Sequence, residues 1–191
     1  MGMKLLECIA PGILRVLPEE EPLSSDAFII EGEARYYVFD VGASDAAYEA
    51  IRALDKPVTA IVSHFHRDHT ANLPRLALDE VLVGARSRKQ LGIGTLVDAP
   101  VCIRDGVEIV VQPCVSPHAP GCLIATVGGK YTLIGDLHYA RPGVGQGEPK
   151  GMLNALKRVA TEYFIVSHAK ENPLVARDDL FREIGVYYGI C

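Results

Sequence analysis

Residues 61–69 read Ile-Val-Ser-His-Phe-His-Arg-Asp-His, and the first two of them end the apolar run 58–62, which predicts a buried strand. Four side chains of metal-binding type therefore follow one strand within six residues: His64, His66, Asp68 and His69. Side chains two apart on an extended chain face the same way, so His64 and His66 are expected to hold one ion. A turn would bring Asp68 and His69 toward a second ion. Imidazole nitrogens and carboxylate oxygens suit a divalent ion such as zinc. The alternative is a polar turn whose histidines are satisfied by hydrogen bonds.

The composition is typical of one globular domain. The chain has 191 residues, of which 49% are hydrophobic and 23% are charged, and this is enough for one substantial core. We therefore predict a single domain over residues 1–191. The formal net charge of −5 argues against a nucleic-acid partner, because clustered Lys and Arg side chains are needed to neutralise phosphate groups.

Cysteine usage and the apolar runs predict a cytoplasmic protein with no membrane partner. The five cysteines are odd in number and include no C-x-x-C pair, which argues against a disulfide framework. The N-terminal apolar stretch is too short for a secretory signal, and no run approaches the ~18 apolar residues of a membrane-spanning helix. The sequence does not indicate an oligomeric state.

Apolar periodicity, glycines and prolines predict alternating strands and helices. Strands are expected at 12–17, 26–39 (a hairpin that turns at 31–33), 58–62, 81–83, 107–111, 122–127, 131–134 and 163–166. Helices are expected at 46–54, 70–78, 85–91, 151–160 and 176–188. The segment 141–150 is rich in glycine and proline but matches no phosphate-binding motif, and we predict that it forms a flexible rim.

Further carboxylates and histidines also follow predicted strands. Asp40 ends the 26–39 hairpin, where it either caps the next helix or supports a metal ligand. His118 lies between two prolines, Asp136 follows the strand at 131–134, and His168 follows the strand at 163–166. The tetrapeptide Ile-Val-Ser-His occurs at 61–64 and again at 165–168. This repeat is either a coincidence between Val-rich strands or the sign of two similar halves with ligands beyond the carboxyl ends of their strands.

Together these residues resemble the ligand set of the metallo-β-lactamase superfamily. The motif H-x-H-x-D-H at 64–69 is followed in order by His118, Asp136 and His168, and Asp40 lies in an Asp-x-Gly sequence before the first helix. The resemblance implies an α/β fold (α+β in some schemes), a four-layer αβ/βα sandwich with metals at one edge. Where two glycines often follow the motif, this chain has Ala71 and Asn72, and the third ligand lies in Ser-Pro-His-Ala-Pro-Gly rather than Pro-Gly-His-Thr. These departures leave the subfamily open.

The resemblance also implies a role for each ligand. The first metal would be held by His64, His66 and His118, the second by Asp68, His69 and His168, and Asp136 would bridge them. Asp40 would then support a ligand rather than cap a helix. Zinc is the first expectation for both ions, with iron or manganese as alternatives. Two such ions would lower the pKa of a bridging water from about 15.7 toward ~7, so that a bridging hydroxide attacks the substrate.

The leading hypothesis is a dinuclear zinc hydrolase that acts on a small carbonyl substrate, namely a thioester, lactone or amide. Asp68 could accept a proton in this reaction. His138 is either a partly exposed loop histidine or a proton donor to the leaving group. The alternatives are a phosphodiesterase with the same site and a mononuclear iron oxygenase that resembles the persulfide dioxygenase branch. A purely structural metal fits poorly, because structural zinc sites have four ligands and are closed.

Overall fold

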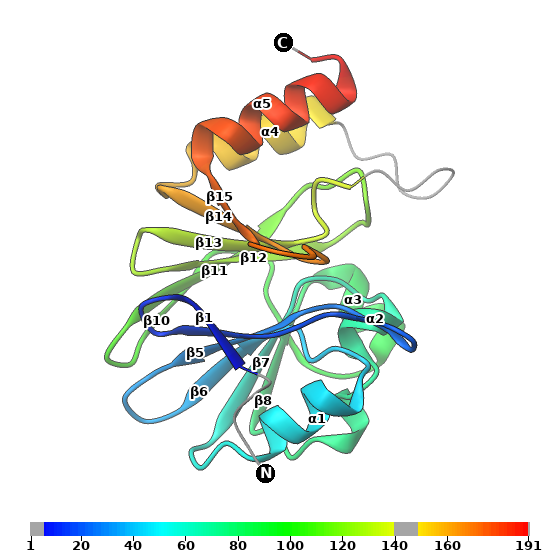
Figure 1. Ribbon diagram of the computed structural model, residues 1–191, viewed down its shortest axis with the longest axis vertical. Coiled ribbons are helices and arrows are strands. Elements are labelled where there is room, and N and C mark those ends of the chain that lie inside the picture. Colours follow the sequence, from blue (N-terminus) through cyan, green and yellow to red (C-terminus); the bar gives the residue numbers. More distant parts are fainter. Residues whose placement is uncertain (1–5, 140–148, 191) are drawn as a thin grey trace.

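The computed structural model describes residues 6–139 and 149–190, and it contains two β-sheets that lie face to face between two groups of helices (Figure 1). The strands of the first sheet are, in spatial order, β1 (Leu6–Ala10), β2 (Ile13–Val16), β5 (Ala27–Glu31), β6 (Tyr36–Phe39), β7 (Val58–Val62), β8 (Glu80–Val83) and β9 (Thr95–Leu96). Those of the second are β10 (Val101–Arg104), β11 (Glu108–Cys114), β12 (Cys122–Val127), β13 (Tyr131–Gly135), β14 (Tyr163–Val166) and β15 (Leu174–Ala176). A small hairpin of β3 (Glu19–Glu20) and β4 (Leu23–Ser24) stands apart.

Helices cover the outer faces of both sheets (Figure 1). The helices beside the first sheet are α1 (Asp45–Arg52), α2 (Arg67–Thr70) and α3 (Ala85–Leu91), and those on the second are α4 (Pro149–Arg158) and α5 (Arg177–Tyr188). The result is the predicted four-layer αβ/βα sandwich. Within the described residues, no helix is long and apolar enough to cross a membrane.

The central strands are buried on both faces, which explains their continuous apolar sequences. In β7, Ile61 packs between the two sheets, whereas Ala60 and Val62 belong to the cluster beneath α1. In β12, Leu123 packs between the sheets and Ile124 packs against the layer of α4 and α5. Each sheet therefore contributes one face to a shared core.

The repeated tetrapeptide marks equivalent strands in the two sheets. In the first sheet β5 and β6 form an antiparallel hairpin and β7 runs parallel to β6. In the second, β12 and β13 are antiparallel and β14 runs parallel to β13. The interpretation as two similar halves is thus supported. Parallel neighbours bring their carboxyl ends to one edge of each sheet, which gathers the residues that follow β6, β7, β13 and β14.

The predicted helix at 70–78 is wrong. The helix begins earlier, at Arg67, and ends at Thr70, and Leu73–Arg75 form one 3-10 turn. Pro74 has no N–H to extend a helical ladder, and the side chain of Asn72 donates to the carbonyls of Val41 and Ser44, at 3.2 and 2.9 Å.

Other predicted boundaries need smaller corrections. Of the predicted rim at 141–150, residues 141–148 lie outside the described part of the chain, and Pro149 and Lys150 begin α4.

The cysteines at 8, 102, 114 and 122 are free thiols, as expected.

Candidate metal centre

Three histidines from both sheets converge on one point. His64 follows β7, His66 precedes α2, and His118 lies on the loop between β11 and β12. The Nε2 atom of His64 lies 2.8 Å from Nδ1 of His66, and Nε2 of His118 lies 3.2 and 3.0 Å from these two atoms. Zn–N bonds of about 2.0–2.1 Å in a tetrahedral site place two nitrogens about 3.3 Å apart. The three nitrogens therefore have nearly the spacing that ligands of one ion require.

A second group lies beside the first. Its members are Asp68, His69, Asp136 and His168. The Nε2 atom of His69 lies 3.5 Å from Oδ2 of Asp68 and 3.3 Å from Oδ2 of Asp136. Nε2 of His168 lies 3.2 and 3.5 Å from the same two oxygens. Two imidazole nitrogens and two carboxylate oxygens therefore surround one position.

Asp136 connects the two groups. Its Oδ2 atom, which lies beside His69 and His168, is also 3.6 Å from Nε2 of His118 in the first group. Nε2 of His69 and Oδ1 of Asp136 are buried without a hydrogen-bond partner among the described residues. Buried polar atoms normally have a partner, and a cation would supply one here. The donor set therefore fits two neighbouring divalent ions.

The partners of the outer ring nitrogens determine which nitrogen faces the centre. Nδ1 of His69 lies 2.7 Å from Oδ2 of Asp40, and Nδ1 of His118 lies 3.0 Å from the carbonyl oxygen of Tyr139. Both oxygens can only accept, so each Nδ1 must donate, and Nε2 is the nitrogen that is left to bind an ion.

Ser63 gives the same result for His64. Its hydroxyl donates to Oδ2 of Asp40 at 2.7 Å, so it must accept from Nδ1 of His64 at 2.9 Å. Asp40 also accepts from the Ser63 backbone N–H at 2.8 Å. The cap of α1 is Ser44, whose side chain accepts from the Ala47 N–H, so the helix-cap alternative for Asp40 is wrong. Sequence reasoning missed Ser63, although its position before His64 in a repeated Ser-His pair was a usable signal.

Burial and neighbouring charges determine the protonation of the residues in the two ligand groups. Burial lowers the pKa of His64 well below its usual value, and the neighbouring histidines lower it further. Burial also opposes the charged form of His69, but the carboxylates of Asp40 and Asp136 hold its pKa well above the usual value. Burial would raise the pKa of Asp68, yet contacts with His168 and His69 lower it to about 2. Asp68 is therefore a carboxylate at neutral pH, which suits a ligand better than a base.

Solved structures with the same architecture identify the fold. DIM-1 metallo-β-lactamase matches with a TM-score of 0.74 and 14% sequence identity, over 97% of this chain and 97% of that one. A metallo-β-lactamase from Pontibacter korlensis matches with a TM-score of 0.69 and 14% identity, over 96% of this chain and 98% of that one.

This chain has the metallo-β-lactamase fold. A mutant flavo di-iron protein from Thermotoga maritima has a similar structure, with a TM-score of 0.65 and 13% identity over 95% of this chain and 60% of that one. No protein-family model matches the sequence, and no curated protein does either.

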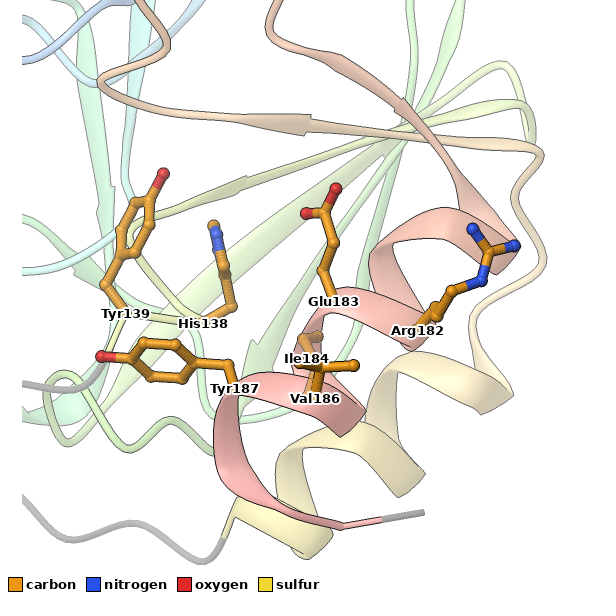
Figure 2. Close-up of a pocket in the computed structure, with 7 residues that line it drawn as sticks. All are labelled: His138, Tyr139, Arg182, Glu183, Ile184, Val186 and Tyr187. Carbon is orange, nitrogen blue, oxygen red and sulfur yellow. The ribbon is translucent and has the colours of Figure 1, made fainter.

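His138 lies apart from the other predicted site residues in this metallo-β-lactamase fold. A cavity of about 430 Å³ at the ligands is lined by Leu23, His66, Arg67, Asp68, His118, Asp136 and His168. His138 lines a different cavity, of about 460 Å³, in which it and Tyr139 lie opposite side chains of α5 (Figure 2). Burial lowers the pKa of His138 to about 4, and its Nδ1 has no hydrogen-bond partner within the described chain. Its role as a proton donor stays a prediction. No sequence pattern indicated that Arg67 and Leu23 line the cavity at the ligands.

Proposed function

We propose that the protein is a metal-dependent hydrolase with two divalent ions, zinc in the first place, that acts on a small carbonyl substrate such as a thioester, lactone or amide. The observation that carries this proposal is the position of Oδ2 of Asp136, which lies 3.3–3.6 Å from nitrogens of both ligand groups. One carboxylate oxygen shared by two sets of ligands is the arrangement of a dinuclear site rather than of a single closed structural site.

The residues present would hold the two ions as the resemblance implies. The first ion would be bound by His64, His66 and His118, the second by Asp68, His69 and His168, with Asp136 between them. Bound ions would supply Lewis acidity and lower the pKa of a water between them toward ~7. The chain itself keeps the Nε2 atoms of three imidazoles directed at the centre through Asp40, Ser63 and the Tyr139 carbonyl.

The cavity beside the ligands favours a small substrate. Its volume of about 430 Å³ lies within the range of small-molecule sites. Leu23, which is 58% exposed, offers an apolar contact at its edge. Arg67 offers an exposed cation on the same wall. A substrate with an apolar part and a negatively charged group would use both.

A phosphodiesterase is the second candidate, and Arg67 is the observation that favours it. A guanidinium beside two ions suits a phosphate group, because arginine binds phosphate oxygens through paired N–H donors. Iron is the alternative metal, because the flavo di-iron protein shows that a similar structure occurs in a protein named for iron. A single iron would support the oxygenase hypothesis.

Elemental analysis coupled to a hydrolysis screen tests the proposal. We expect close to two divalent ions per chain, and turnover of a substrate among thioesters, lactones, amides, β-lactams and phosphodiesters. His69→Ala should release the second ion alone. His138→Ala is the matched control, because it removes a histidine that is outside both ligand groups and outside the cavity at the ligands. One tightly held iron in protein produced with every metal available would overturn the dinuclear zinc proposal.

A further inference from the structure

A buried arginine on β2 forms an ion pair with a buried aspartate beside β5. Arg15 and Asp26 are both fully buried, and Nε of Arg15 donates to Oδ1 of Asp26. Arginine is rarely buried, because removing its charge from water is costly unless the charge is paired and its remaining donors are satisfied. The remaining hydrogen bonds of Arg15 and Asp26 show which part of the chain the pair contacts.

Both members of the pair bind the segment that carries His168. Oδ2 of Asp26 accepts the backbone N–H of His168 at 2.7 Å. Nη1 of Arg15 donates to the carbonyl of Glu171 at 2.6 Å, and Nη2 donates to the carbonyl of Ala169. Three hydrogen bonds from two side chains therefore fix residues 168–171, which lie more than 140 positions later in the sequence.

The backbone of His168 needs such support. Its φ angle is +59°, in the left-handed region that residues with a Cβ adopt at an energetic cost. Conformations of this kind persist where the surroundings determine them, and they concentrate at functional sites. The hydrogen bond to Asp26 is made by the N–H of the strained residue itself.

The residue next to Asp26 holds a second member of the same ligand group. The N–H of Ser25 donates to the backbone carbonyl of Asp68 at 2.9 Å. Residues 25 and 26 thus contact the backbones of Asp68 and His168, whose side chains approach to 3.2 Å. Residues 25 and 26, which lie between β4 and β5, therefore link α2, which carries Asp68, to the loop that carries His168.

We propose that Arg15 and Asp26 are positioning residues for the second metal: together they hold the loop of His168 so that its imidazole faces Asp68. The inference rests on the proposed function, which assigns both residues to that metal. The histidines of the first group are held differently, through Ser63 and the Tyr139 carbonyl. Loss of the pair should therefore weaken the second metal selectively.

Zinc titration of the double variant Arg15→Met/Asp26→Leu tests the selectivity. Removing both charges avoids the uncompensated buried charge that either single variant would leave. We expect the Kd of the second ion to rise about 10–100-fold, the range for loss of groups that orient metal ligands, with the first ion bound as in the wild type. Ile51→Ala, on the buried face of α1, is the control for a general loss of stability, and this variant should bind both ions normally.

Hydrogen exchange of the His168 amide gives a readout that needs no metal. In the metal-free wild type this N–H should exchange slowly, and in the double variant it should exchange at least about 10-fold faster, while amides of β7 stay protected. Unchanged protection together with unchanged binding of both ions would overturn the inference. A wild type that binds fewer than two ions would contradict the proposed function instead, and amide exchange would still decide whether the pair holds His168.

Discussion

At the scale of single residues, the centre is organised by acceptors that lie behind the histidines. Asp40 is the main one, since it receives hydrogen bonds from His69 and from both the N–H and the hydroxyl of Ser63. Its φ angle is +58°, a conformation that aspartate and asparagine tolerate better than most residues. These contacts turn the Nε2 atoms of the histidines toward the metal positions before any ion binds.

Asp40→Asn tests this organisation while keeping the shape and the backbone preference of the side chain. Oδ2 of Asp40 accepts from both His69 Nδ1 and the Ser63 hydroxyl, and Oδ1 accepts from the Ser63 N–H. An amide replaces one of these oxygens by an NH2 donor, so the three hydrogen bonds can no longer all be made. We expect the affinity for the second ion to fall about 10–100-fold, as measured by competition with a chelator. The control is Asp45→Asn, which changes an exposed carboxylate at the start of α1. Equal affinities in wild type and Asp40→Asn would contradict the role of Asp40.

His138 needs a kinetic test, because its position does not decide its role. It lines the cavity beside α5 and not the one at the ligands, so we expect His138→Ala to retain both ions and to lower kcat less than about 10-fold. A proton donor would instead lose about 10²–10⁴-fold. That loss would shrink for a nitrophenolate leaving group, which departs without a proton. Comparing the two kinds of substrate therefore distinguishes a donor from a residue that only lines a cavity.

At the scale of elements, the sequence predicted the central strands and the residues that follow them. Strands such as β7 and β14 are continuous apolar runs, and metal-binding side chains follow them directly. The apolar run therefore predicts the strand, and the polar residues after it predict the site. The edge strands β10 and β15 were missed because their side chains are partly exposed and show no clear alternation. The helix at 70–78 failed because the contacts of Asn72 outside the helix, and Pro74, override local propensity.

The convergence of the site could not be predicted from spacing alone. His118 approaches His64 to 3.2 Å across 54 positions of sequence, and this depends on how the two sheets pack. The Arg15–Asp26 pair lies still farther along the sequence from the residues it holds, 142 positions for His168 and 156 for Glu171. The assignment of the ligands to two metal sites came from the resemblance to known ligand sets. Local sequence patterns did not predict it.

Gly135, the last residue of β13, allows the two sheets to approach at the site. Its φ angle is +54°, and a Cβ there would lie 2.8 Å from Oγ of Ser63, which directly follows β7 of the other sheet. Gly135→Ala should therefore lower the free energy of unfolding by about 2–4 kcal/mol in urea, through backbone strain and overpacking. Gly128→Ala is the matched control, because its φ angle is +57° and its Cβ would meet nothing within 4 Å, so only about 1 kcal/mol should be lost. Equal losses would show that the approach to Ser63 is unimportant.

At the scale of the whole molecule, the candidate centre lies across the boundary between the two sheets. The segment 64–69 follows a strand of the first sheet, whereas His118, Asp136 and His168 follow strands of the second. Among the described residues, direct backbone contact at this edge includes the Leu123 N–H, which donates to the Ser63 carbonyl at 2.8 Å. Ions bound between these ligands would therefore join the two halves of the protein.

Thermal unfolding should depend on the metal for this reason. A ligand that binds only the folded state stabilises it by about 4 kcal/mol when its free concentration is 1,000 times its Kd. For a chain of this size each kcal/mol raises the Tm by roughly 2–4 °C, so excess zinc should raise the Tm of chelator-treated protein by roughly 8–16 °C for each ion that binds. Scanning calorimetry measures the shift directly. His66→Ala, which removes a ligand of the first group only, should retain part of this shift. The second group would still join the two sheets, because Asp68 and His69 follow a strand of the first sheet and Asp136 follows a strand of the second. If protein shown by elemental analysis to contain two ions has the same Tm after they are removed, the ions do not hold the sheets together, and the stability of this edge must come from the protein contacts alone.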